Sequence, residues 1–362
     1  MTEVPEDQYW SVVTKENSSE YPNYQDYDEW SGMCQRSDVR QFARYFLPPF
    51  YLVVFLLGFV GNILVVVLYA YNKRVKTMTD VYLLNLAVAD ILFLCTLPFW
   101  ALDAVSGWVF GDFMCKAAAS IYKINFFSCT LLLSCISVDR YIAIVMAVKA
   151  RGSRRKMLLR SKMASLLVWL SAVILSLPEL CFSRQDSAQG RCLTVYPEKL
   201  LKASGLAVQV AAGFFLPFAV MAFCYATVVW KLLRAHTLQR HRAIKVIGTV
   251  VAAFVLSQLP YNSLVIVRAM DAINITITDC QTVKNLDVAT QVAQSVAFLH
   301  SCLNPLLYAF IGVKFRKDLL RILKDVGCAG TVSAKPQPGP SKTNSKFPPV
   351  HSETETTGTL SL

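Results

Sequence analysis

Residues 46–71 read FLPPFYLVVFLLGFVGNILVVVLYAY, a stretch without a single Asp, Glu, Lys or Arg. About 20 consecutive apolar residues are enough for a helix to cross the roughly 30 Å hydrocarbon layer of a bilayer. Further apolar stretches occupy about 78–101, 112–145, 160–180, 202–232, 242–268 and 286–311. Because lipid cannot satisfy backbone polar groups, each stretch is predicted to be a helix. The sequence therefore predicts an all-α membrane protein, a bundle of seven transmembrane helices.

The composition agrees with this prediction, since 54% of the 362 residues are hydrophobic and 17% are charged. The net charge of +12 is segregated along the chain, so it does not indicate a nucleic-acid partner. Basic residues predict cytosolic connections by the positive-inside rule. They follow the first, third, fifth and seventh spans, and include Lys73, Arg74, Lys76, Arg154, Arg155, Lys156, Arg240, Arg242, Lys314, Arg316 and Lys317.

The chain divides into four predicted regions. Residues 1–45 form an acidic extracellular segment, and residues 46–311 form the transmembrane bundle. Residues 312–328 alternate apolar and basic side chains, which predicts a short amphipathic eighth helix on the inner membrane surface, in contact with lipid. Residues 329–362 are rich in Ser, Thr, Pro and Gly and are predicted to be a disordered cytosolic tail. The expected location is the plasma membrane, with multiple crossings, an extracellular N-terminus and no cleavable signal peptide.

Individual polar and proline residues fall in a fixed order across the spans. The set comprises Asn62, Asp90, Asp139, Arg140, Tyr141, Trp169, Pro217, Pro260, Asn304, Pro305 and Tyr308. Over roughly residues 40–325 this order resembles the rhodopsin class of G-protein-coupled receptors. The residues also show no nucleophile and base pair, metal cluster or phosphate loop, so an enzyme is not expected.

The resemblance implies that activation and G-protein contact depend on residues in the cytosolic half. These are Asp139, Arg140, Tyr141, Tyr225, Pro260, Asn304, Pro305 and Tyr308. The Asp139 carboxylate is expected to hold the Arg140 guanidinium until an activating motion frees it. Pro260 lacks a backbone donor, so span six is expected to pivot there. Two departures from the class are Arg240, where many relatives carry an acidic partner for Arg140, and Gln258, where Trp is common.

Asp90 is a carboxylate inside a predicted transmembrane helix, which makes it a functional candidate. Two interpretations stay open: an allosteric sodium site or a structural hydrogen-bond hub. His300 stands where many members of the class carry Asn. The residues that match the sodium pocket of the class are Asp90, Asn125, Cys129, Ser301 and Asn304.

Two stretches resemble the chemokine receptors in particular: Thr96–Trp100 (TLPFW) and Asp139–Val145 (DRYIAIV). Others, such as Val39–Ala43 (VRQFA), are similar to the C-C receptors. This resemblance implies a C-C chemokine as ligand. Four predicted extracellular cysteines allow three pairings. The resemblance selects Cys115 with Cys192 and Cys34 with Cys280.

Ligand binding is expected in two places. The acidic N-terminal segment, with its candidate sulfation sites, would attract a basic chemokine, although a merely solvated acidic tail also fits. A pocket among the helices would accept the chemokine's N-terminus, while core packing competes as an explanation for Trp100 and Tyr122. Gln294 replaces the Glu that meets the ligand's amine in most chemokine receptors. The predicted ligand-binding residues are Tyr21, Tyr24, Tyr27, Asp26, Asp28, Trp100, Tyr122, Tyr261, Arg268 and Gln294.

Several modification sites are also predicted. Asn17 and Asn274 are N-glycosylation acceptors, and Cys328 is either a palmitoylation site or a plain thiol. Ser and Thr in the tail are candidates for receptor kinases, with arrestin as the reader.

The predicted function is signalling through an inhibitory-class heterotrimeric G protein to direct leukocyte chemotaxis and calcium mobilisation. One rival is a scavenging, atypical chemokine receptor that internalises ligand without G-protein signalling. The other rival is a transporter or channel, against which the spans show no paired halves and no chain of titratable groups.

Overall fold

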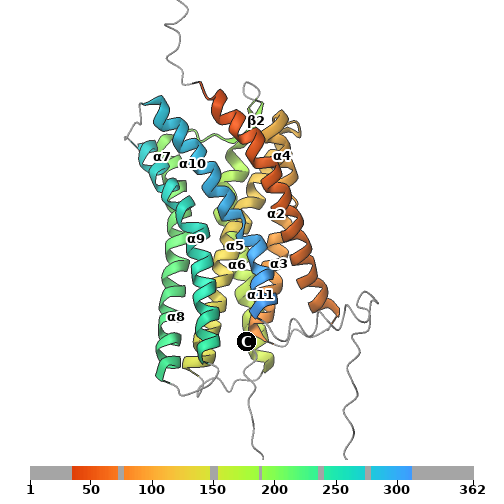
Figure 1. Ribbon diagram of the computed structural model, residues 1–362, viewed down its shortest axis with the longest axis vertical. Helices are drawn as coiled ribbons and strands as arrows, with labels where there is room; N and C mark the ends of the chain where they lie inside the picture. The colour runs from red at the N-terminus through yellow and green to blue at the C-terminus, as the bar shows by residue number, and fades with distance from the viewer. Residues whose placement is uncertain are drawn as a thin grey trace, which may run out of the picture.

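The computed structural model describes residues 35–71, 77–146, 154–186, 190–234, 240–273 and 279–311. The predicted N-terminal segment up to residue 34, the amphipathic helix and the tail lie outside these residues. The described part is a bundle of long helices with one small hairpin at the predicted extracellular end (Figure 1).

Each predicted span corresponds to one helix or to consecutive helices. In chain order they are α2 (Ser37–Tyr71), α3 (Met78–Leu94), α4 (Leu97–Ser106), α5 (Gly111–Val145), α6 (Arg154–Phe182), α7 (Lys199–Val210), the π-helix η2 (Ala211–Phe215), α8 (Leu216–Arg234), α9 (Arg240–Ile273), α10 (Cys280–Phe298) and α11 (His300–Ile311). Within the described residues, six helical segments are long and apolar enough to cross a membrane. The seventh crossing is α10 with α11, which together run the length of the bundle (Figure 1). The seven-helix prediction is confirmed.

Polar side chains are buried within the bundle and large apolar side chains face outward. Asn62, Asp90 and Asn125 are at most 2% exposed, whereas Leu57 of α2 is 63% exposed and Ile174 of α6 is 63% exposed. A water-facing surface would not present so much apolar area, but lipid accepts it. The surface therefore agrees with a multi-pass membrane protein.

Span five changes its helical geometry just before Pro217. The π-turn η2 inserts there, a feature that often marks functional sites. Gly213 of η2 packs against the ring of Phe126 in α5, and a Cβ added at Gly213 would overlap Phe126 Cε1. Only glycine allows this close approach, so Gly213 determines how the π-turn meets α5.

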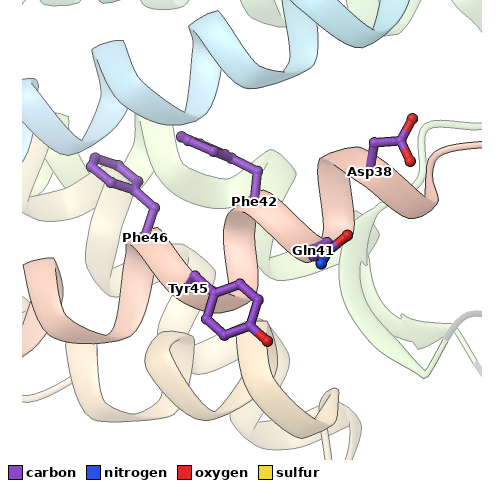
Figure 2. Close-up of a pocket in the computed structure, with 5 residues that line it drawn as sticks. All are labelled: Asp38, Gln41, Phe42, Tyr45 and Phe46. Carbon is purple, nitrogen blue, oxygen red and sulfur yellow. The ribbon is translucent and has the colours of Figure 1, made fainter.

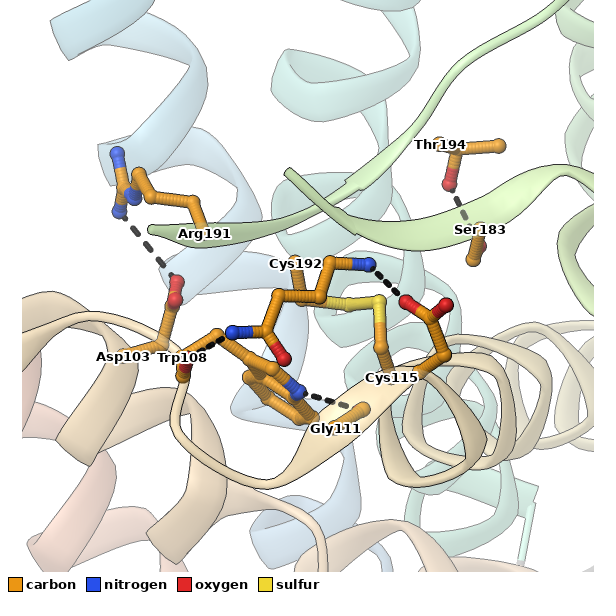
Figure 3. Close-up of a disulfide and its surroundings, with 10 residues drawn as sticks. Asp103, Trp108, Gly111, Cys115, Ser183, Arg191, Cys192 and Thr194 are labelled. Carbon is orange, nitrogen blue, oxygen red and sulfur yellow. Dashed lines mark hydrogen bonds and ion pairs between the residues drawn. A yellow bond between two sulfur atoms is a disulfide. The ribbon is translucent and has the colours of Figure 1, made fainter. Parts of the chain in front are cut away.

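A two-stranded hairpin covers the predicted extracellular end. Strands β1 (Ser183–Asp186) and β2 (Arg191–Thr194) pair antiparallel, with Gln185 opposite Cys192. The predicted disulfide between Cys115 and Cys192 is present, and it ties β2 to the top of α5 (Figure 3).

The turn between α4 and α5 holds the same hairpin from its other side. The buried Trp108 donates its backbone N–H to Gly190 O at 2.7 Å, and Gln185 Nε2 donates to Trp108 O at 2.9 Å. Gly107 has φ 84°, and a Cβ there would lie 2.6 Å from Gly190 O. The hairpin is therefore fixed to α5 by the disulfide and to the turn between α4 and α5 by hydrogen bonds.

Candidate functional site

The described residues place the predicted site residues at three levels of the bundle. We call these levels the mouth, beneath the hairpin; the hub, around Asp90; and the cytosolic end, around Arg140. Each level joins side chains from at least two helices.

At the hub, the buried carboxylate of Asp90 accepts hydrogen bonds from side chains of α5 and α11. Asn125 Nδ2 and Ser301 Oγ donate to Oδ1 at 3.0 and 2.9 Å, and Asn304 Nδ2 donates to Oδ2 at 2.9 Å. Asn62 Nδ2 of α2 donates to Ser301 O at 2.8 Å, which extends the network to a fourth helix. The structure thus shows the hydrogen-bond hub that the sequence left as one of two interpretations.

The same residues also bear on the sodium prediction. The Asp90 carboxylate and the Ser301 hydroxyl offer the oxygen atoms that a hard cation prefers. Cys129 Sγ lies 3.4 Å from Asp90 Oδ1, and His300 Nε2 lies 3.8 Å from that oxygen. The donor set fits a cation in type, and the amide N–H groups of Asn125 and Asn304 already donate to the carboxylate that such an ion would share.

At the cytosolic end, a threonine links Asp139 and Arg140. Arg140 Nη2 donates to Thr79 Oγ1 at 2.8 Å, and the same hydroxyl donates to Asp139 Oδ2. The sequence predicted that Asp139 holds the guanidinium, and the structure inserts the Thr79 hydroxyl of α3 between them. We call this group the Thr79 latch. A signal for it was present, since Thr79 lies in the stretch that begins span two, opposite the end of span three.

Other residues close the cytosolic end around the latch. Tyr225 of α8 is buried within hydrogen-bonding reach of Ser137. The ring of Tyr141 lies 5.9 Å from that of Phe223, and Lys231 Nζ of α8 donates to Val145 O of α5 at 2.7 Å. Helices α5 and α8 are therefore held together there. The side chains of Arg240 and Tyr308 are outside the described part of the chain, so their predicted roles stay predictions.

At the mouth, two predicted ligand-binding tyrosines meet. Tyr122 Oη of α5 donates to Tyr261 Oη of α9 at 3.1 Å, and Gln294 of α10 lies within hydrogen-bonding reach of Tyr122. Trp100 instead packs against Trp108 beside the disulfide, with ring centroids 5.4 Å apart. The three polar groups meet between α5, α9 and α10, and we call them the floor of the mouth, while Trp100 lies on the side toward the hairpin.

Arg268 lies at the rim of the mouth and already has partners. Its Nη2 lies 2.8 Å from Asp287 Oδ1 and donates to Thr290 Oγ1 at 3.1 Å. Arg36, just before α2, lies 3.2 Å from Asp287 Oδ2. Asp287 thus receives two guanidinium groups, and it joins the start of α2 to α9 and α10.

Sequence reasoning missed an ion pair beside the mouth. Lys123 Nζ of α5 lies 3.1 Å from Glu179 Oε1 of α6, and their side chains are 13% and 9% exposed. Lys123 also donates to Gln209 Oε1 of α7. The signal was available, because charged residues inside apolar spans are costly and are commonly functional.

The first turns of α2 line a separate hollow. Asp38, Gln41, Phe42, Tyr45 and Phe46 line it, and Phe42 and Phe46 stack with centroids 5.1 Å apart (Figure 2). It shares no residue with the mouth as predicted from the sequence.

Several predicted residues lie outside the described part of the chain. Cys280 is disulfide-bonded, but its predicted partner Cys34 is outside, so that pairing stays a prediction. Next to Cys280, the hydroxyl and the backbone N–H of Thr282 donate to the Asp279 carboxylate and hold its pKa below the ordinary value. Also outside are Asn17, Tyr21, Tyr24, Asp26, Tyr27, Asp28, Asn274 and Cys328.

Comparison with known proteins gives consistent matches. Residues 61–308 match the 7 transmembrane receptor (rhodopsin family). The chain is 51% identical over 303 residues to C-C chemokine receptor type 9 of Mus musculus, which covers 82% of each chain. It is 48% identical over 309 residues to C-C chemokine receptor type 7 of Homo sapiens, covering 84% of this chain and 81% of the relative.

A third relative is Atypical chemokine receptor 4 of Homo sapiens, 42% identical over 306 residues, with 83% of this chain and 86% of the relative covered. The sequence stretches that favour the C-C receptors are most like type nine, with types ten and seven close, and types nine and seven are among these matches. The family is one of receptors and not of enzymes. The chain therefore belongs to the C-C chemokine receptors of the rhodopsin family, which are multi-pass membrane proteins.

Proposed function

We propose that this chain is a plasma-membrane receptor for a C-C chemokine that activates an inhibitory-class heterotrimeric G protein. The observation that carries the proposal is the Thr79 latch, which restrains Arg140 by hydrogen bonds that a helix movement can break. Relatives named as C-C chemokine receptors support the ligand class. Leukocyte chemotaxis and calcium mobilisation are the expected responses.

Binding is proposed to begin at the acidic N-terminal segment. Its negative field raises the encounter rate with a basic chemokine. The chemokine's own N-terminus then enters the mouth and contacts the floor formed by Tyr122, Tyr261 and Gln294. Aromatic walls with a few polar groups suit the end of a peptide chain.

Activation follows as a shift between two populations of the receptor. A chemokine that binds the open state better than the closed one moves the equilibrium toward the open state. In the open state, α9 pivots near Pro260, Arg140 leaves Thr79, and the guanidinium becomes available to the G protein. Tyr225, buried beside Ser137 in the closed arrangement, is then a candidate partner for Arg140.

The test is ligand-driven nucleotide exchange in membranes that contain this receptor and a purified inhibitory-class G protein. A panel of C-C chemokines is screened, with Arg140→Ala as the control receptor. At least one chemokine is expected to stimulate exchange in the wild type and not in the variant. If Arg140→Ala responds as strongly as the wild type, the mechanism is wrong.

The alternative is a scavenging receptor, since Atypical chemokine receptor 4 is also a relative, although at 42% identity it is less similar than the C-C receptors of types nine and seven. That function predicts chemokine uptake without nucleotide exchange. Measuring both in the same cells separates the two functions, because uptake alone supports scavenging and chemokine-driven exchange supports signalling. The intact Asp139-Arg140-Tyr141 sequence favours signalling.

A sodium ion at the hub is a further part of the proposal. A bound cation would offset the charge of Asp90 and stabilise the closed state. Replacing sodium with a large organic cation is then expected to raise chemokine affinity in the wild type and to leave Asp90→Asn unchanged. Equal affinity in both salts for the wild type would reject the ion and leave the hydrogen-bond hub.

The remaining predictions concern modifications and tail partners. Receptor kinases and arrestin are proposed to act on the Ser and Thr residues of the tail. Mass spectrometry of receptor from secretory cells tests tyrosine sulfation, N-glycosylation and palmitoylation. The residues to be checked are Tyr21, Tyr24, Tyr27, Asn17, Asn274 and Cys328.

A further inference from the structure

The ion pair between Lys123 and Glu179 is unusual for its place in the bundle. Both side chains are largely buried, and they come from two different transmembrane helices. A buried ion pair contributes little net stability, since the cost of desolvating two charges offsets their attraction. Packing alone therefore gives little reason to place these charges here.

Gln209 adds a second, independent observation. It is 2% exposed, and its Oε1 accepts from Lys123, while its Nε2 has no hydrogen-bond partner among the described residues. A buried amide N–H without a partner is costly unless another molecule satisfies it. Lys123, Glu179 and Gln209, which we call the Glu179 group, thus hold a charge pair and a spare donor together.

The Glu179 group adjoins the floor of the mouth. Lys123 follows Tyr122 in α5, and Gln209 precedes Val210, whose side chain packs with Tyr261. Lys123 Nζ lies 5.9 Å from the centroid of the Tyr122 ring and 3.1 Å from Glu179 Oε1, so the ion pair lies beside the floor.

Among the described residues, three carboxylates at this end of the bundle that are at most 14% exposed have cationic partners, and they differ in the kind of partner. Asp287 is held by two arginines, and Asp103 lies 3.5 Å from the guanidinium of Arg191 under the hairpin (Figure 3). Glu179 alone among the three is held by a lysine. A guanidinium binds a carboxylate through a planar fork, whereas an ammonium is a compact charge on a flexible stem.

The amino terminus of a peptide is itself an ammonium with three N–H donors, like the side chain of lysine. It can take the place of Lys123 on Glu179 without leaving a buried carboxylate unpaired. The displaced Lys123 keeps Gln209 Oε1 as an acceptor. Gln209 Nε2 can then donate to a carbonyl of the entering peptide.

We propose that Glu179 is the carboxylate that binds the amino-terminal ammonium of the chemokine, and that Lys123 occupies this position until the ligand displaces it. The inference rests on the proposed function. Glu179 then provides an amine-binding carboxylate on α6. The uncharged Gln294 of α10 cannot provide one.

The experiment uses the full-length receptor and the C-C chemokine that activates it in the panel, in two forms. One form has a free amino terminus and the other is acetylated there. Glu179→Gln is expected to raise the half-maximal concentration of the free-amine form about tenfold or more, the loss typical of a charged hydrogen bond. Acetylation is expected to lower the potency of the chemokine by a similar factor on the wild type and to change it little on Glu179→Gln, because acetylation and the substitution remove the same contact.

Variants of Lys123 separate ligand binding from a structural role. Lys123→Met removes the competing ammonium, so the free-amine chemokine is expected to become more potent. Lys123→Arg keeps the positive charge but holds Glu179 with a fork, so potency is expected to fall while surface expression is maintained. If Lys123→Met does not reach the cell surface, the comparison of Lys123→Arg with the wild type shows whether the cation at position 123 affects chemokine potency.

Each outcome has one meaning. The inference would be overturned if acetylation weakened the chemokine as much on Glu179→Gln as on the wild type, because the two changes would then remove different contacts. It would also be overturned if the potency of the chemokine were the same on Lys123→Arg as on the wild type. In both cases the proposed function would stand, because a chemokine still activates the receptor. A panel in which no C-C chemokine activates or is taken up would reject the proposed function, and the inference with it.

Discussion

The mouth and the cytosolic end each hold a cation beside a carboxylate, but in different ways. In the Glu179 group, Lys123 contacts a carboxylate from another helix directly, at 3.1 Å. In the Thr79 latch, Arg140 is connected to the carboxylate of its own sequence neighbour through a hydroxyl from α3. A competing ammonium can break the first contact, whereas a helix movement breaks the second. The two ends are therefore built to respond to different events.

Removing the disulfide should disrupt chemokine binding at the mouth and leave the cytosolic end unchanged. Cys192→Ser frees β2 from α5, and loss of a native disulfide costs about 2–5 kcal/mol in small domains. We expect chemokine binding to fall by at least about a hundredfold, while basal nucleotide exchange per receptor at the surface stays near the wild-type value. Radioligand binding and exchange assays on the same membranes check this. Retained binding would show that the hairpin is not needed to shape the mouth.

Gly213→Ala should strain the segment between the two ends. The new Cβ would overlap the ring of Phe126, so α5 or η2 must shift. Overpacking of this kind costs about 1–3 kcal/mol. We expect a lower Tm in detergent, with partial recovery in the Gly213→Ala, Phe126→Leu double variant. A Tm equal to that of the wild type would show that the π-turn adapts without cost.

Thr79→Val should release the cytosolic end alone. The change keeps the shape of the side chain and removes the hydroxyl that Arg140 and Asp139 share. Loss of such hydrogen bonds to charged groups is worth about 1.5–3 kcal/mol, so basal nucleotide exchange is expected to rise severalfold or more. Thr79→Ser, which keeps the hydroxyl, is the matched control and should resemble the wild type. Unchanged basal exchange in Thr79→Val would mean that the latch does not restrain the receptor.

An exposed ion pair provides the smallest expected effect. Lys284 Nζ lies 3.1 Å from Asp38 Oδ2, and the Asp38 side chain is 76% exposed. Surface pairs of this kind contribute little to stability, because water screens the charges. Lys284→Met should leave the Tm and chemokine potency nearly unchanged. A large fall in Tm or in chemokine potency would mean that an exposed ion pair matters as much as the buried pair of the Glu179 group.

Most of the fold was predictable from the sequence, because lipid imposes strong constraints on composition. The apolar stretches, the basic connections and the ordered motif residues gave the spans and their orientation. The hub was also predicted, since Asp90 and its partners match positions that the receptor class shares. What remained open there was the choice between a cation and hydrogen bonds alone.

The contacts between helices could not be predicted in the same way. Thr79 reads as an ordinary helix-start residue until α3 and α5 are placed side by side. Lys123 and Glu179 are far apart in the sequence, and only their burial in apolar spans signals a partner. The π-turn at Ala211–Phe215 has no clear sequence pattern, and the contact of its Gly213 with Phe126 of α5 is visible only in the structure.

The central claim is that occupancy of the mouth and release of Arg140 are coupled. Coupling between binding sites is reciprocal, so a nucleotide-free G protein must raise chemokine affinity as much as the chemokine raises G-protein affinity. The most direct measurement is chemokine affinity in lipid nanodiscs with and without nucleotide-free inhibitory-class G protein, for the wild type and Arg140→Ala. We predict that the G protein raises affinity at least about fivefold in the wild type and leaves Arg140→Ala unchanged. Equal affinities with and without G protein in the wild type would contradict the account.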